Sequence, residues 1–277
     1  MAGGVGKTPI VREIAGFLEN SAVIMRGYGA RRRAQSSEFR VQSSDSAVMV
    51  GDEAKMLSDS GIPVFVGKDR PASIKMAEKA GFSYIIMDDG FQNPTVKKDV
   101  SILVFDEKIG IGNGFMLPAG PLREPLCLGS ERADAIIIIS EKDVLGAKNQ
   151  KSEIINHKSK TPVFLAKKHT VNPGLSGKVV AFSGIGYPQK FFDSVREMNK
   201  VRMVETVSFP DHYEYGADDF EKLFSLAEKH GAELVCTEKD WVKFPENIKN
   251  KIKYAPLVVE IEPKFYDWLE ENLKTEN

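Results

Sequence analysis

The hexapeptide Gly3-Gly4-Val5-Gly6-Lys7-Thr8 constrains the fold of this chain more than any other feature. Glycines let the main chain wrap so closely around a phosphate that several N–H groups converge on it. Lys7 adds a positive charge for the β- and γ-phosphates, and Thr8 offers a hydroxyl to Mg²⁺. A helical pattern begins at Pro9, and the positive end of a helix favours the same anion. The hexapeptide therefore predicts a phosphate-binding P-loop of the shortened GGxGKT form.

Short apolar runs alternate with helical patterns along most of the 277 residues. Runs of this length between helices are typical of strands in a parallel sheet that is covered on both faces. We therefore expect an α/β fold, with a doubly wound, mostly parallel sheet of the P-loop NTPase type. In the first half the predicted strands are Ala22–Met25, Ala47–Val50, Val64–Val66, Tyr84–Met87, Ile102–Phe105 and Ala135–Ile139, and the predicted helices are Pro9–Leu18 and Ile74–Ala80.

The sequence turns polar and lysine-rich over Asp143–Ser159, and the strand–helix alternation then restarts. This change predicts a nucleotide-binding domain over residues 1–150, followed over residues 151–277 by a linker and a smaller α/β domain. The predicted strands of the second half are Val163–Ala166, Val179–Phe182, Met203–Ser208 and Leu234–Thr237, with helices from Pro188, over Ala217–His230 and over Lys264–Leu273.

The apolar run Tyr84–Met87 ends in Asp88-Asp89, which extends to Asp88-Asp89-Gly90-Phe91-Gln92. A strand that ends in acid places a carboxylate at the carboxyl edge of the sheet, where the Mg²⁺ of a P-loop enzyme lies. Many strands end in aspartate because aspartate favours turns, so this pair alone is a weak signal. Together with the hexapeptide it predicts the second half of a nucleotide site.

Composition excludes some functions and leaves others open. The 38 Lys and Arg residues nearly balance 39 Asp and Glu, which gives no reason to expect a nucleic-acid partner. Cys127 and Cys236 form no CxxC pair, and no apolar run approaches the roughly 20 residues that cross a bilayer, so we expect a cytoplasmic protein. The basic cluster of Arg26 and Arg31–Arg33 is either a solvated loop or a contact for anions or lipid headgroups.

Several further motifs carry a family resemblance. They are GGVGKTP, MRGYGARR, VGDE, DDGFQ, GNGFMLPAGPLREP, FSGIGYPQKFF, FPDHYEY and CTEKDWVKF, which run from Gly3 to about Phe244. In this order they resemble the tetraacyldisaccharide 4'-kinases of lipid A biosynthesis. The resemblance implies transfer of the γ-phosphate of ATP, with Mg²⁺, to the 4'-hydroxyl of tetraacyldisaccharide 1-phosphate, giving lipid IVA. It also implies a peripheral protein on the cytoplasmic face of the inner membrane.

The resemblance further implies roles for individual residues. Asp52 becomes the catalytic base, paired with His212, and Lys7 the phosphate-binding cation. General-base help of this kind is worth about 10²–10⁴-fold. The remaining implied sites fall into three groups: nucleotide contacts at Ala2, Gly3, Gly4, Val5, Gly6, Lys7, Thr8, Gln92 and Arg123; metal ligands at Thr8, Asp88, Asp89 and Glu124; and substrate contacts at Arg26, Tyr28, Glu53 and Arg70.

This chain departs from the family pattern in two places. Only Met1 and Ala2 precede Gly3, so we expect the strand that normally carries a P-loop, and the family's apolar N-terminal helix, to be missing from a truncated chain. Asn93 follows DDGFQ, where the family usually has histidine. Two alternatives stay open. The chain could be another GGxGKT-type NTPase that acts as a nucleotide switch, although such proteins commonly have lysine where Ala2 stands. It could also be an inactive fragment of the kinase.

Overall fold

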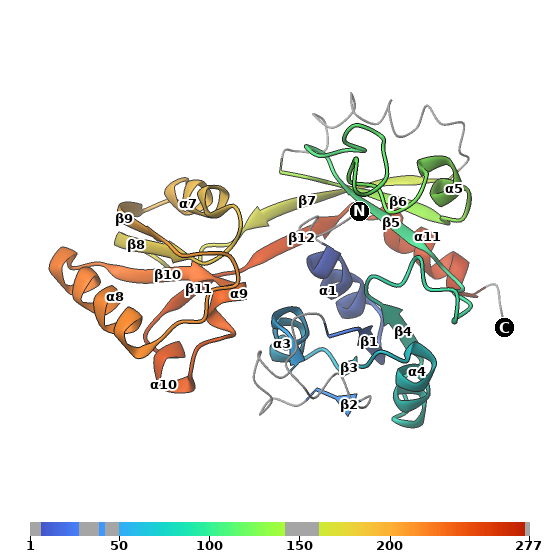
Figure 1. Cartoon of the computed structure of the whole chain (residues 1–277), viewed down its shortest axis with the longest axis horizontal. Helices are drawn as coiled ribbons and strands as arrows, with labels where there is room; N and C mark the ends of the chain where they lie inside the picture. Colours follow the sequence, from blue (N-terminus) through green and yellow to red (C-terminus); the bar gives the residue numbers. More distant parts are fainter. Residues whose placement is uncertain (1–6, 28–38, 42–49, 142–160, 275–277) are drawn as a thin grey trace. The chain divides into compact units, whose positions relative to one another are not determined.

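The structure is a computed structural model that describes residues 7–27, 39–41, 50–141 and 161–274. The chain divides into two compact units, each built from separate stretches of sequence (Figure 1). Unit 1 contains the described parts of Met1–Met25, Asp69–Lys168 and Val259–Asn277. Unit 2 contains those of Arg26–Lys68 and His169–Val258.

Unit 1 is an α/β structure with parallel strand pairs. Strand β1 pairs with β4, and β5, β6 and β7 pair in that order, all in parallel, with β12 on the other side of β7. The elements are α1 Lys7–Phe17, β1 Ser21–Met25, α4 Arg70–Lys79, β4 Tyr84–Met87, β5 Ile102–Asp106, α5 Leu126–Glu131, β6 Ala135–Ser140, most of β7 Val163–Thr170, most of β12 Leu257–Ile261, and α11 Lys264–Lys274.

The core of unit 1 joins residues from both ends of the sequence. Ile10 and Ile14 of α1 pack in one cluster with Ile137 of β6 and with Phe265 of α11. Phe265 is fully buried and meets Phe164 edge to face, with ring centroids 5.3 Å apart. Burial of these apolar surfaces is what brings the C-terminal helix back onto the unit that begins with α1.

Unit 2 carries a parallel sheet in the order β11-β10-β8-β9 and a separate antiparallel pairing of β2 with β3. Successive residues of β8 serve opposite faces of the sheet: Val180 and Phe182 pack with α8, whereas Val179 and Ala181 pack with α7 (Figure 1). The elements are β2 Phe39–Arg40, α3 Asp52–Asp59, β3 Val64–Val66, β8 Gly177–Ser183, α7 Pro188–Arg196, β9 Val201–Ser208, α8 Ala217–His230, β10 Glu233–Thr237, α9 Glu238–Trp241, α10 Glu246–Lys249 and β11 Lys253–Ala255.

The predicted fold class is confirmed, and most predicted strands coincide with observed ones to within a few residues. The predicted strand Ala47–Val50 lies outside the described residues except for Val50, which is helical. The predicted polar segment, Asp143–Ser159, lies entirely outside them. The two units do not follow a single cut near residue 150, because β12 and α11 return to unit 1 while residues 26–68 join unit 2.

Helices in the described part of the chain are all too short or too polar to cross a membrane.

Candidate active site

The amino end of α1 and the carboxyl end of β4 meet at Asp89. The Lys7 ammonium binds one oxygen of the Asp89 carboxylate, and Nη1 of Arg123 lies 2.7 Å from the other. The predicted strand with an acidic end is therefore present, and its acid contacts the P-loop lysine. Thr8 is buried in the first turn of α1. The predicted phosphate contacts Ala2, Gly3, Gly4, Val5 and Gly6 lie outside the described residues.

A specific backbone geometry presents the Asp89 side chain. The Asp88 N–H donates to the carbonyl of Ile24, so the β1–β4 ladder continues to the end of β4. Asp89 then turns the chain with φ +55°, a left-handed conformation that aspartate tolerates better than most residues. At Gly90 a Cβ would lie 2.5 Å from Sδ of Met87, which explains why glycine stands there.

Electrostatics keep the Asp89 carboxylate ionised. Partial burial by itself would raise the pKa of Asp89, but the hydrogen bonds and positive charges of Lys7 and Arg123 outweigh burial and lower the pKa below its usual value. The two cations come from positions 82 and 34 residues away along the chain. A single carboxylate therefore holds together two groups that can both bind phosphate.

Gln92 and Glu124 also meet, as part of a second cluster in unit 1. Nε2 of Gln92 donates to the Glu124 carboxylate over 2.8 Å, and Arg132 forms an ion pair with the same carboxylate. The Arg132 guanidinium lies 5.0 Å from the ring centroid of Phe91, a cation–π contact. A surface hollow of about 460 Å³ lies here and is lined by Gln92, Glu124, Leu128, Glu131 and Arg132.

The predicted pair of Asp52 and His212 comes together in unit 2. Asp52 is the first residue of α3, after Gly51 with φ +94°, and His212 also has a positive φ of +58°. Nδ1 of His212 lies 3.5 Å from Oδ2 of Asp52. The backbone N–H of His212 donates to the carbonyl of Gly184, which anchors the histidine turn beside β8. Two residues that are 160 positions apart in sequence thus form an acid–base pair.

Two lysines of one turn flank this pair, and the sequence analysis assigned a role to neither. Nζ of Lys239 lies 3.4 Å from Nε2 of His212, and Nζ of Lys243 lies 3.8 Å from Oδ2 of Asp52. An ammonium can only donate, so a hydrogen bond from Lys239 requires Nε2 of His212 to accept, and in that tautomer the ring proton is on Nδ1, facing Asp52. The motif CTEKDWVKF was visible in the sequence, but a lone lysine in a motif does not show which side chain it contacts.

The predicted substrate contacts fall in different environments. Arg26 and Glu53 are exposed, and Tyr28 lies outside the described residues. Arg70 is only 5% exposed, and its Nη2 donates to the carbonyl of Asp88 over 3.3 Å. Arg70 therefore braces the turn that carries Asp89. Asn93, where the family usually has histidine, accepts hydrogen bonds from the N–H and hydroxyl of Thr95 and closes a local turn.

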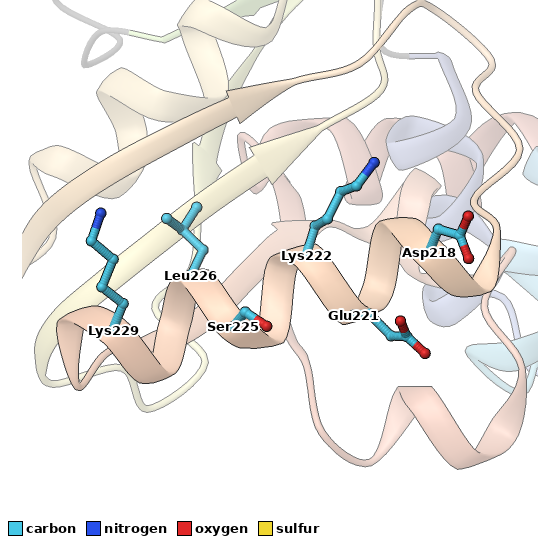
Figure 2. Close-up of a pocket in the computed structure, with 6 residues that line it drawn as sticks. All are labelled: Asp218, Glu221, Lys222, Ser225, Leu226 and Lys229. Carbon is cyan, nitrogen blue, oxygen red and sulfur yellow. The ribbon is translucent and has the colours of Figure 1, made fainter.

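A shallow hollow of about 540 Å³ lies along α8, away from these residues (Figure 2). Its lining consists of Asp218, Glu221, Lys222, Ser225, Leu226 and Lys229. All six side chains come from one helix and fan outward from it, as Figure 2 shows, so they do not converge on a common point. We therefore assign it no ligand.

The charge cluster at Asp89 predicts a pH-dependent stability. The pKa of Asp89 is lower in the folded state than its ordinary value of 3.8, so the ionised carboxylate stabilises the folded state at any pH above 3.8. This contribution is lost as the pH falls through the lower folded-state pKa. Asp89→Asn should therefore reduce the free energy of unfolding at pH 7, and the difference from the unsubstituted protein should shrink towards pH 2. Urea unfolding at several pH values measures it. The exposed Glu221→Gln is the control, and a deficit of the Asp89 variant that is constant with pH would contradict the assignment.

Comparison with known proteins places these observations in a family. The sequence profile of the family described as tetraacyldisaccharide-1-P 4'-kinase matches residues 1–274. A tetraacyldisaccharide 4'-kinase of Phenylobacterium zucineum is 40% identical over 92% of this chain and 77% of its own length. One of Methylobacterium nodulans is 41% identical over 88% of this chain and 72% of its own length.

A solved structure agrees with the sequence comparison. LpxK from Aquifex aeolicus, crystallised in complex with ATP, superposes with a TM-score of 0.75 at 25% sequence identity. The match covers 98% of this chain and 85% of that protein. The motif resemblance, the α/β fold and the profile match agree, and this chain belongs to the tetraacyldisaccharide-1-phosphate 4'-kinase family.

Proposed function

We propose that this chain transfers the γ-phosphoryl group of ATP to the 4'-hydroxyl of tetraacyldisaccharide 1-phosphate. Family membership supports the reaction class, and the pair of Asp52 and His212 is the observation that carries the argument. A sugar hydroxyl is a poor nucleophile at neutral pH, and a positioned carboxylate can accept its proton as the new P–O bond forms. A nucleotide switch has no acceptor hydroxyl and needs no such pair.

The proposed chemistry assigns a separate task to each cluster. Lys7 and Arg123 bind and orient phosphate oxygens, and they offset the negative charge that develops during transfer. Asp52 accepts the proton of the sugar hydroxyl. His212, with its proton on Nδ1, donates towards Asp52 and orients the carboxylate. Gln92 and Ala2 to Gly6 complete the nucleotide contacts of the proposal, and Arg26, Tyr28 and Glu53 form its substrate side. The buried Arg70 supports the Asp89 turn instead.

The proposal includes Mg²⁺ as a cofactor. Thr8, Asp88, Asp89 and Glu124 supply hydroxyl and carboxylate oxygens, the donors that Mg²⁺ prefers. Within the described residues, no three His, Cys, Asp or Glu side chains are grouped so that they could hold a metal alone. Mg²⁺ commonly takes one or two carboxylates and completes its shell with phosphate oxygens and water, so this donor set fits it. The ion would neutralise charge on the β- and γ-phosphates.

Catalysis by Asp52 and His212 can be tested with a mutant cycle. Asp52→Ala should lower kcat by roughly 10²-fold or more, because the hydroxyl loses its proton acceptor, while ATP still binds. His212→Ala should have a similar effect, and the double variant should lose less than the product of the two single losses. Phosphate transfer from radiolabelled ATP to the acylated disaccharide measures kcat.

A Lys7→Ala variant serves as the contrasting case, because it should lose most activity through weaker nucleotide binding. Fully multiplicative losses for Asp52 and His212 would mean that they do not act as a unit. ATP hydrolysis that is independent of the disaccharide would favour the nucleotide switch instead.

We propose that the chain meets its glycolipid at the cytoplasmic face of the inner membrane as a peripheral protein. Large apolar side chains are exposed in and around the loop between β5 and α5, which is the unusual GNGFMLPAGPLREP segment. They are Ile109, Phe115, Met116, Leu117 and Leu128, of which Phe115 is 64% exposed. Exposed apolar side chains close in sequence can insert among acyl chains, and this supports contact with an acylated substrate or its bilayer.

Replacing two of these side chains tests the proposed membrane contact. The combined change Phe115→Ser and Leu117→Ser should weaken binding to anionic phospholipid vesicles at least about tenfold, because each buried methylene contributes about 0.8 kcal/mol and a tenfold change needs only about 1.4 kcal/mol. Co-sedimentation with vesicles measures the partition. Tyr187→Ser, at a residue that is 81% exposed in unit 2, is the matched control. Equal partitioning of all three proteins would remove this loop from the membrane contact.

A further inference from the structure

Lys243 lies between two carboxylates and is almost completely enclosed. Its side chain is 9% exposed. Nζ lies 3.8 Å from Oδ2 of Asp52 and 3.5 Å from Oδ1 of Asp240, and it donates to the carbonyl of Tyr213 over 3.4 Å. Desolvating an ammonium is costly unless its charge is paired, so this position is maintained by the two acids around it.

Asp240 is the fixed member of the arrangement. Its side chain is fully buried, and one oxygen, Oδ2, accepts hydrogen bonds from the Ser183 hydroxyl, the Gly184 N–H and the Thr237 hydroxyl at 3.1, 3.0 and 2.6 Å. These donors belong to the ends of β8 and β10, which are neighbours in the sheet. The carboxylate cannot rotate without breaking several bonds, so it holds Lys243 in place from the sheet edge.

Asp52 is the less enclosed of the two carboxylates, with its side chain 20% exposed. Its Oδ2 faces both Nδ1 of His212 and Nζ of Lys243. Both of these ion-pair contacts in the described residues are made at Oδ2. Because both nitrogens approach the carboxylate from the Oδ2 side, Oδ1 is the oxygen that accepts a proton in the proposed arrangement. The His212 side chain is 67% exposed, whereas Lys243 is enclosed, so Lys243 is the more rigid of the two supports.

We propose that Lys243 is a positioning residue for Asp52, braced by the buried carboxylate of Asp240. The proposal rests on the proposed function, in which Asp52 accepts the proton of the sugar hydroxyl. In this role Lys243 acts on Asp52 and not on ATP or substrate: it holds the Oδ2 side of the carboxylate so that Oδ1 is presented to the hydroxyl. Displacing a reacting group by about 1 Å can cost roughly 10²-fold in rate.

The competing explanation is structural: Lys243 would serve only to neutralise Asp240. Breaking a buried ion pair leaves an uncompensated charge and destabilises a protein strongly, whereas replacing both members by neutral side chains is often harmless. A pair of variants separates the two explanations. Lys243→Met leaves Asp240 charged and alone, whereas Lys243→Met combined with Asp240→Asn removes both charges and restores a neutral interior.

We expect Lys243→Met to lower kcat by roughly 10–10²-fold while the KM for ATP changes less than about twofold. The combined variant with Asp240→Asn should recover thermal stability and keep the low kcat, because Asp52 still lacks its support. Lys243→Arg should retain part of kcat, since it restores a cation. The control is Lys249→Met, at another enclosed lysine of unit 2, which pairs with Glu246 and should keep wild-type kcat.

The decisive measurement is Lys243→Met in the Asp52→Ala background. A residue that acts through Asp52 has nothing left to position there, so kcat should change less than about twofold from Asp52→Ala alone. An equal loss in both backgrounds would overturn the proposal, as would recovery of kcat together with stability in the combined Asp240→Asn variant. Wild-type kcat in Asp52→Ala itself would remove the proton-acceptor role and this inference with it. If Asp52→Ala lowers kcat and Lys243→Met lowers it further by its full factor in that background, the positioning role of Lys243 is overturned and the proposed function stands.

Discussion

The nucleotide-binding side of unit 1 depends on the charge pairing at Asp89. Lys7 and Arg123 are both cations, and bringing them near one point is unfavourable unless an anion lies between them. The Asp89 carboxylate is that anion, with one oxygen for each cation. The left-handed turn at Asp89, the absence of a side chain at Gly90 and the buried guanidinium of Arg70 behind Asp88 all hold the carboxylate at the end of β4. In the proposed function Lys7 and Arg123 are the phosphate ligands, and their contacts with Asp89 would hold them in place before a phosphate binds.

Unit 2 contains a similar arrangement of charges with the signs reversed. There a cation, Lys243, lies between two carboxylates, Asp52 and Asp240. Oδ2 of Asp240 accepts hydrogen bonds from donors at two strand ends, so this carboxylate is structural, whereas Asp52 is the one that the proposed function gives a chemical role. In both units a charge of one sign organises two of the other sign. In the proposed function, the groups that act on a substrate are thus held by groups that need not touch it.

The sequence predicted the elements whose signals are local. Strands such as Ala135–Ile139 are continuous apolar runs between helical patterns, and they appear where expected. Strands β2, β11 and β12 were missed: β2 has only two residues, and β11 and β12 are not set off by a helical pattern between them as Val64–Val66 and the other predicted strands are. The assignment of β12 and α11 to unit 1 was not predicted either, since it depends on burial of Phe265 against residues more than 100 positions away.

The residues of the candidate site divide in the same way, into those that a local motif predicted and those whose contacts only the fold shows. Asp52, His212, Lys7, Asp89 and Arg123 stand in motifs whose residue types already point to phosphate or proton chemistry, and the structure places them in two clusters. Lys243 and Asp240 carry no such mark, because a lysine and an aspartate three residues apart also describe any solvated helix face. Only the fold shows that the aspartate is fully buried and that the lysine reaches Asp52. Enclosing these charges costs desolvation free energy, and in return the lysine is held within ion-pair distance of Asp52. In the proposed function this arrangement supports proton transfer from the sugar hydroxyl to Asp52.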